Sequence, residues 1–196
     1  MRNTIIAILF ILLVVYILIS FIGSALVKRK IRELYINEKY DEYLEYLDSK
    51  ICKVYVKDYE IEEHKYKVYL KRNDRAHIDE YFDKMLNRKV DRNTKLQYQI
   101  KAFYYYMVNN GPDKCKQLLE DIKAYGDEDV TKQVNYLYEI VVLGKGDYID
   151  EIKQILEEKP NNEAFYEYIL SVSYENIGDT KNAKKYKKTY KDHMHG

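Results

Sequence analysis

Tryptophan is absent from this chain of 196 residues, which also has only two prolines, seven glycines and two cysteines. Because proline and glycine interrupt regular backbone, their scarcity favours long helices and argues against turn-rich β structure. Two cysteines cannot form a multi-bridge disulfide framework, and neither Cys52 nor Cys115 belongs to a CxxC pair. We interpret both as small, partly buried thiols, and a single disulfide between them stays open.

Catalytic and metal-binding patterns are also missing. None of the four histidines stands in an HExxH motif or beside a nucleophile pattern, and there is no glycine-rich phosphate loop. His193 and His195 lie two positions apart, so they do not share a helix face. Acidic pairs such as Glu62-Glu63 are typical of solvated helix faces. We therefore predict no catalytic residue, no metal site and no cofactor.

Neither sign of charge predominates. The chain has 33 Lys and Arg against 32 Asp and Glu, and Arg2 alone among them precedes Lys28, so residues 28–196 hold 32 of each. Proteins that bind nucleic acid usually carry a basic excess, because Lys and Arg make the phosphate contacts. The balance therefore argues against a nucleic-acid partner, and the high charge content suits a helical protein with a solvated surface.

One long apolar run is present at the N-terminus. Residues 4–27 contain no charged side chain, and as a helix they would span about 36 Å, more than the roughly 30 Å of a bilayer core. We predict a retained transmembrane anchor over residues 1–27. A cleaved signal peptide is the alternative, since such peptides also begin with a positive charge and an apolar run.

Cations cluster on one side of this run. Lys28, Arg29, Lys30 and Arg32 follow it, whereas only Arg2 precedes it. Positive flanks stay on the cytoplasmic side, so we predict a single-pass membrane protein with a cytoplasmic C-terminal domain. The four cations after the run are expected at the membrane surface, within reach of anionic headgroups.

Residues 28–36 are expected to continue the membrane helix. Ile31, Leu34 and Tyr35 stand at helical spacing, so this end could pack on the helices that follow it. A flexible joint at residues 28–30 is the alternative. Inside the run, Ser20 and Gly23 are small residues at helical spacing, together with Ser24, and would allow weak self-association of the membrane helix.

Turn-like residues recur at regular intervals along the rest of the chain, each followed by a helical pattern. They stand at Asn37, Asn73, Gly111, Gly146 and Gly178, at intervals of 36, 38, 35 and 32 residues. Apolar residues between the turns repeat every three to four positions, as Leu96, Ile100 and Phe103 do. The predicted helices cover residues 4–36, 38–50, 53–71, 75–88, 93–109, 112–125, 128–144, 147–158, 162–177 and 179–192. We divide the chain into the anchor (1–27), a basic juxtamembrane segment (28–36), a helical-repeat domain (37–192) and a C-terminal tail (193–196).

This pattern resembles the tetratricopeptide repeat family. The last unit matches the family's large, small, aromatic, glycine and alanine positions at Leu170, Ser171, Tyr174, Gly178 and Ala183, with Asp179 after the glycine. The turn Gly146-Asp147-Tyr148 is also typical of the family, whereas Glu151, Lys187 and Tyr190 depart from it. The resemblance covers residues 37–192 by period and roughly the last 60 of them by motif. It implies an all-α fold in which the transmembrane helix is followed by a right-handed α-solenoid of helical hairpins. The pentatricopeptide family, which binds RNA, has a similar period, and the charge balance argues against it.

A solenoid of stacked hairpins presents a concave surface, and the resemblance implies that the first helix of each pair binds protein or peptide segments there. With the glycine turns aligned, this surface would be lined by Tyr98, Lys101, Tyr105, Tyr136, Ile140, Tyr168 and Val172. Tyrosine suits recognition because it brings contact area at low entropy cost. Packing within the helix seams is the alternative role for each of these residues.

The sequence thus predicts a membrane scaffold without enzymatic activity, which holds protein or peptide partners at the membrane. Two alternatives stay open. One is a regulatory helical-repeat module that binds a signalling peptide or nucleic acid, and the other is a non-catalytic subunit of a membrane complex.

Overall fold

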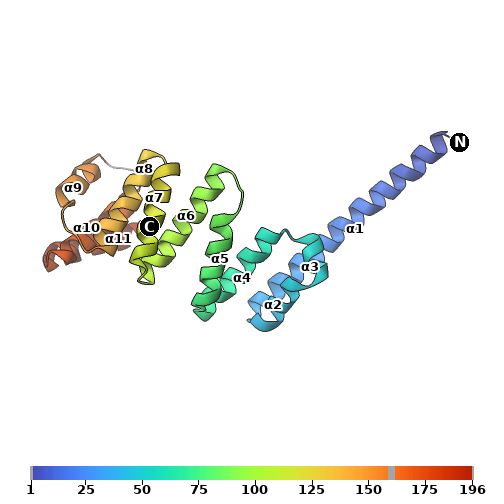
Figure 1. The fold of residues 1–196 in the computed structure, drawn as a ribbon, viewed down its shortest axis with the longest axis horizontal. Coiled ribbons are helices and arrows are strands. Elements are labelled where there is room, and N and C mark those ends of the chain that lie inside the picture. The colour runs from blue at the N-terminus through green and yellow to red at the C-terminus, as the bar shows by residue number, and fades with distance from the viewer. Residues whose placement is uncertain (1, 159–161, 196) are drawn as a thin grey trace. The chain divides into compact units, whose positions relative to one another are not determined.

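The computed structural model describes residues 2–158 and 162–195, and the regular structure of these residues is entirely helical. The all-α prediction is therefore confirmed. The chain forms two compact units, an N-terminal unit (Met1–Lys84) and a C-terminal unit (Met85–Gly196), and the division falls inside helix α5. Figure 1 shows the order of the helices along the chain.

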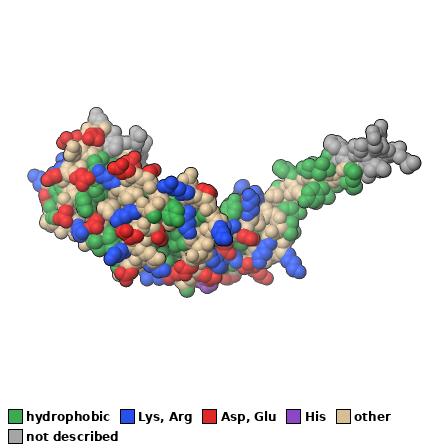
Figure 2. Space-filling model, turned by 45° about the horizontal axis from the view of Figure 1, so that its top comes forward, with side chains coloured by type: hydrophobic (Ala, Val, Ile, Leu, Met, Phe, Trp, Pro, Cys, Tyr) green, Lys and Arg blue, Asp and Glu red, His purple; other side chains and the backbone are tan. Residues whose placement is uncertain are grey.

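The N-terminal unit begins with one long helix and continues with shorter ones. Its elements are α1 (Arg2–Ile36), α2 (Tyr40–Asp48), α3 (Lys50–Tyr55), α4 (Asp58–Arg72) and α5 (Arg75–Asn87). Helix α1 is the one described helix that is long and apolar enough to cross a membrane, by length and composition. Figure 2 shows hydrophobic side chains over its described apolar part, which is largely exposed.

Helix α1 runs without interruption from this exposed apolar part into the core of the N-terminal unit. Val27, Ile31 and Leu34 are buried, at intervals of four and three residues that place them on one helix face. This face packs on α2 and α3, where Leu47 and Cys52 are also buried. Residues 28–30 lie inside the helix, so they form no joint.

Helices α4 and α5 close the N-terminal unit through aromatic packing. The rings of Tyr66 and Tyr81 are stacked with their centroids 4.3 Å apart, and Phe82 meets Tyr66 edge to face at 5.5 Å. The rings of Tyr69 and His77 form a second stacked pair at 4.5 Å. Tyrosine therefore supplies much of this seam, as its apolar ring and polar tip allow.

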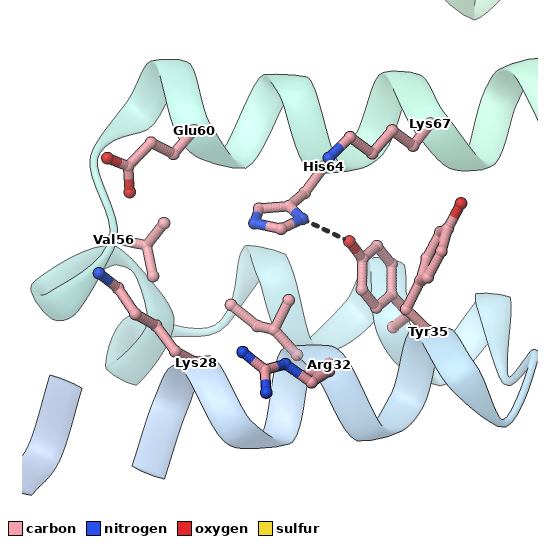
Figure 3. Close-up of a pocket in the computed structure, with 9 residues that line it drawn as sticks. Lys28, Arg32, Tyr35, Val56, Glu60, His64 and Lys67 are labelled. Atoms are coloured by element: carbon pink, nitrogen blue, oxygen red, sulfur yellow. Dashed lines mark hydrogen bonds between the residues drawn. The ribbon is translucent and has the colours of Figure 1, made fainter. Parts of the chain in front are cut away.

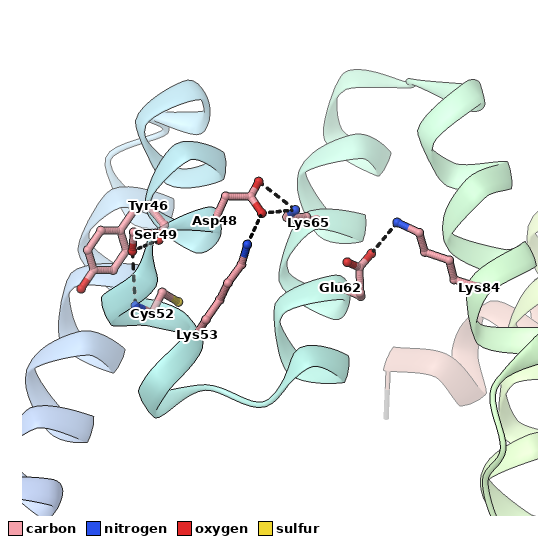
Figure 4. Close-up of polar contacts among 8 residues, drawn as sticks. All are labelled: Tyr46, Asp48, Ser49, Cys52, Lys53, Glu62, Lys65 and Lys84. Carbon is pink, nitrogen blue, oxygen red and sulfur yellow. Dashed lines mark hydrogen bonds and ion pairs between the residues drawn. The ribbon is translucent and has the colours of Figure 1, made fainter.

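The predicted boundaries over residues 38–71 are wrong, because three helices stand where two were expected. Ser49 has extended backbone, its hydroxyl donates to the Tyr46 carbonyl at 2.6 Å, and it accepts from the Cys52 amide at 3.2 Å (Figure 4). It therefore ends α2 and caps α3. Val56 and Lys57 are extended as well, and they separate α3 from α4.

The C-terminal unit contains the remaining helices. They are α6 (Arg92–Val108), α7 (Pro112–Tyr125), α8 (Glu128–Tyr136), the π-helix η1 (Leu137–Val142), α9 (Ile149–Glu157), α10 (Glu163–Asn176) and α11 (Thr180–His195). Aspartate caps begin α6 and α8, where Asp91 accepts from the Thr94 amide at 3.0 Å and Asp127 from the Val130 amide at 2.8 Å. Helix α7 packs against α6, α8 and η1, and α10 packs against η1, α9 and α11. Consecutive helical pairs of this unit thus lie side by side.

The sequence did not predict the π-helix. It continues α8 without a break and ends near Asn176, whose side-chain amide donates to the carbonyls of Ile140 at 2.8 Å and Lys145 at 3.0 Å. A π-turn leaves backbone carbonyls without their usual helical donors, and a side chain can satisfy them. Asn176 therefore connects the end of α10 to the π-helix and the loop after it.

Left-handed backbone marks the turn of each helical pair. Among the described residues, positive φ angles occur at Glu38, Asn73, Asn110, Gly144 and Gly178, which are 35, 37, 34 and 34 residues apart. Each of them separates two neighbouring helices. A left-handed residue is a common way to end a helix and reverse the chain. The observed turns lie within two residues of the predicted ones.

Candidate functional site

A pocket of about 430 Å³ opens in the N-terminal unit between the C-terminal part of α1 and α4 (Figure 3). This volume falls in the range of small-molecule sites, which are roughly 300–1,000 Å³. The residues that line it are Lys28, Ile31, Arg32, Tyr35, Tyr43, Val56, Glu60, His64 and Lys67.

Two helices supply the polar lining at the same spacing. Lys28, Arg32 and Tyr35 stand four and three residues apart on α1, and so do Glu60, His64 and Lys67 on α4. Residues at this spacing share one helix face. Each helix therefore presents one polar row to the pocket, and Ile31, Tyr43 and Val56 supply the buried wall.

The imidazole of His64 is held by a buried tyrosine. The Tyr43 hydroxyl lies 2.7 Å from His64 Nδ1, the contact drawn in Figure 3. Burial raises the pKa of Tyr43, so its hydroxyl is neutral and can donate this hydrogen bond. In the tautomer of neutral His64 in which Nδ1 accepts it, the proton is on Nε2. Burial, together with the nearby charge of Lys67, lowers the pKa of His64 and favours this neutral form.

Several other charged side chains of the unit form ion pairs, among them those drawn in Figure 4. Lys65 Nζ lies 2.8 and 2.9 Å from the two carboxylate oxygens of Asp48, and Lys53 Nζ lies 3.4 Å from the same carboxylate. The hydrogen bond from Lys65 lowers the pKa of Asp48. Lys84 forms a longer ion pair with Glu62, with 3.6 Å between nitrogen and oxygen.

The cations of the pocket differ from these. Among the described residues, no carboxylate lies within ion-pair distance of Lys28, Arg32 or Lys67. Glu60 is the single carboxylate of the lining, so the pocket carries an excess of positive charge with His64 neutral. Ammonium, guanidinium and Nε2–H groups are all hydrogen-bond donors. These groups can therefore bind an anion.

The four cations predicted at the membrane surface divide between different faces of α1. Lys28 and Arg32 line the pocket, whereas Arg29 is exposed outside it. Lys30 lines a separate, shallower cavity with Glu42 and Glu45. Sequence reasoning missed the half of the pocket that α4 provides. The one available signal was the matching spacing of Glu60, His64 and Lys67, which gains meaning only when a partner helix is known.

The residues predicted to bind partners all lie in the C-terminal unit, and three of them are buried. Tyr136 and Ile140 are 2% and 0% exposed, and Tyr105 is also in the core. The hydroxyl of Tyr136 donates to Glu151 at 2.8 Å. Side chains buried to this degree cannot line an open surface, which corrects their assignment. Tyr98, Lys101, Tyr168 and Val172 are partly exposed, so their role in binding stays a prediction.

The thiols and the C-terminal histidine do not form a further site. Cys52 and Cys115 are both free and buried, and burial raises the pKa of Cys115 to about 11. His193 Nδ1 lies 2.7 Å from a Glu167 carboxylate oxygen, and this contact raises the pKa of His193. In the part of the chain that the structure describes, no three His, Cys, Asp or Glu side chains converge as metal ligands would. The side chain of His195 lies outside the described residues.

No protein-family model, curated protein sequence or solved structure matches this chain.

Proposed function

We propose that this protein is a single-pass membrane adaptor, in which helical hairpins of the tetratricopeptide type hold protein or peptide partners at the membrane surface. The observation that carries the proposal is the continuity of α1. One unbroken helix includes both the exposed apolar run and the buried residues Ile31 and Leu34. A helix that is anchored in lipid and also forms part of a protein core fixes the height of that core above the bilayer.

The repeated turn supports the hairpin architecture. Left-handed residues recur every 34–37 residues, which is close to the 34-residue period of tetratricopeptide repeats. Within the C-terminal unit, neighbouring helical pairs pack on one another. A chain built in this way buries its apolar faces between successive pairs and leaves an extended surface for partners. We infer that this surface includes Lys101 and Tyr168 and that it faces the cytoplasm, because positive flanks stay on that side.

Crosslinking in native membranes tests partner binding. Full-length tagged protein is crosslinked, captured and analysed by mass spectrometry, and the Lys101→Ala/Tyr168→Ala variant is compared with wild type. We expect this variant to lose the captured partner. The matched control is Lys116→Ala/Tyr125→Ala, which removes the same residue types from exposed positions of α7. Equal capture by wild type and the Lys101→Ala/Tyr168→Ala variant, or an equal loss in the control, would contradict the assigned surface.

Membrane residence and orientation are tested separately. We expect the full chain to remain in the membrane pellet after an alkaline carbonate wash, because the apolar run spans the bilayer. A phosphatase reporter that is active only outside the cytoplasm, fused after residue 196, should be inactive. Release of the protein by carbonate would refute the anchor, and an active reporter would refute the orientation.

A further inference from the structure

The pocket lies at the end of the apolar run of α1. The contact between α3 and α1 shows how close α3 comes to this run. A Cβ atom built on Gly23 would overlap the phenol group of Tyr55, so this side chain packs directly on the backbone of α1. Gly23 precedes Val27, the end of the apolar run, by four residues, which is about 6 Å along a helix. The end of α3 therefore stands beside the apolar part of α1.

Helix α3 exposes apolar side chains there. Ile51 is 53% exposed and Val54 is 74% exposed, and exposed Lys50 and Lys53 lie next to them in the sequence. On α1, Leu26 is exposed as well. Exposed apolar side chains next to a membrane-length helix suit lipid, and Lys50 can extend its ammonium group to the headgroups. These residues place the bilayer surface at the level of α3.

This level puts the pocket in the headgroup layer. The polar layers add about 10–15 Å to a core of about 30 Å, or roughly 5–8 Å on each side. Lys28 is the first residue after the apolar run, and Arg32 lies one helical turn beyond it, about 6 Å further. Val56, which lines the pocket, directly follows Tyr55. Lipid phosphates occupy the same layer as these side chains.

We propose that this pocket binds the phosphate headgroup of an anionic phospholipid from the surrounding leaflet. Arg32, Lys67 and Lys28 neutralise the phosphate, and the Nε2–H of His64 adds a neutral donor. Glu60 accepts a hydrogen bond from a headgroup hydroxyl, so a glycerol headgroup suits the pocket better than a plain phosphate. The proposal rests on the membrane anchoring proposed above. Depth in the bilayer and the exposed α3 face favour lipid over free phosphate as the source of the anion.

Native mass spectrometry of the full chain tests this site. Delipidated protein in a non-ionic detergent is titrated with phosphatidylglycerol, and with phosphatidylcholine of the same acyl chains. We expect one phosphatidylglycerol to be retained in preference to phosphatidylcholine. The variant Arg32→Gln/Lys67→Gln should weaken its binding by about a hundredfold, because each of two charge-assisted hydrogen bonds contributes about tenfold or more. The single variant Lys67→Gln should weaken phosphatidylglycerol binding by about tenfold. It replaces the double variant as the test if that variant is less well folded.

The matched control is Arg29→Gln/Lys30→Gln, which removes the same charge from the same stretch of α1 outside the pocket. Binding close to that of wild type is expected there, because Arg29 and Lys30 do not line the pocket and a non-ionic micelle presents no anionic surface to them. An equal loss in this control would show that the lipid is attracted by the general positive charge of residues 28–32 and not bound in the pocket. Displacement of the lipid by millimolar inorganic phosphate would identify a free-phosphate site instead. Both variants should stay in carbonate-washed membranes and capture the same partners, so a failed lipid site leaves the proposed adaptor function intact.

Discussion

Replacing Leu34 with alanine tests whether the end of α1 belongs to the core of the N-terminal unit. Leu34 is 3% exposed and packs with the apolar residues of α2 and α3. Removing a fully buried leucine side chain costs about 3 kcal/mol, within the roughly 2–5 kcal/mol found for such sites, because burial is lost and a cavity remains. The variant should therefore loosen α2 and α3 from α1 and leave the apolar part of α1 unchanged.

Hydrogen exchange measured by mass spectrometry gives a local readout for the full chain in lipid nanodiscs. A loss of about 3 kcal/mol corresponds to about a hundredfold faster exchange for amides that open with the unit. We expect this change in α2 and α3. Exchange in α10 and α11 of the C-terminal unit should not change. Local exchange suits this protein, because its two units need not unfold in one transition.

The control is Leu26→Ala, the same substitution two turns earlier in the same helix. Leu26 is 59% exposed, so the alanine removes much less packing within the protein than Leu34→Ala does. Its effect on exchange in α2 and α3 should be less than about twofold, as for surface substitutions that change stability by under about 0.5 kcal/mol. If Leu34→Ala were no more disruptive than Leu26→Ala, α1 would not be part of the core, and a fixed height above the membrane would have no basis.

Three further predictions concern single positions. The pKa of His64 is lower in the folded protein than its unfolded value of about 6.5, so its stabilising effect is complete above that pH and is lost as pH falls toward the folded pKa. The protection factors of α4 amides, which correct for the slower intrinsic exchange at lower pH, should therefore fall between pH 7.5 and 5.5 in wild type, and less so in His64→Gln. Asn176→Ala should lower the stability of the C-terminal unit by about 2 kcal/mol, about one for each of two lost hydrogen bonds to backbone carbonyls. Hydrogen exchange around η1 should then become faster. Asn93→Ala, at an exposed position, should change exchange little. Gly178 has a φ of 78°, so Gly178→Ala should lower the free energy of unfolding by about 1 kcal/mol. Gly178→Asn should be closer to wild type, because asparagine tolerates left-handed backbone. Equal thermal midpoints for all three proteins would refute backbone strain at this position.

Local patterns were enough to predict the helices and their turns. The spacing of Ile31 and Leu34 indicated a buried face on the last part of α1, and both residues are buried there. Asn73 and Gly178 were predicted turn residues, and both have left-handed backbone. These features depend on near neighbours in the chain, so periodicity and turn chemistry reveal them.

Features that depend on tertiary contacts were missed. Ser49 ends α2 although the apolar period continues through it, because its hydroxyl satisfies the carbonyl before it and the amide after it. The burial of Tyr136 and Ile140 reflects packing that a count from aligned turns does not show. Likewise, the pocket forms only because α4 lies beside α1, and no local sequence pattern predicts which two helices become neighbours.

The two rows on α1 explain how one helix can both pack into the core of the N-terminal unit and line the pocket. Val27, Ile31 and Leu34 make up the buried row, and the pocket row is the same set shifted by one residue, Lys28, Arg32 and Tyr35. One residue corresponds to about 100° around a helix, so the two rows lie on adjacent faces. Burying the first row therefore turns the second toward α4, where its two cations meet His64 and Lys67. The packing of α1 on α2 and α3 thus also sets the direction of the positive charge in the pocket, which is the arrangement that the proposed anionic headgroup needs.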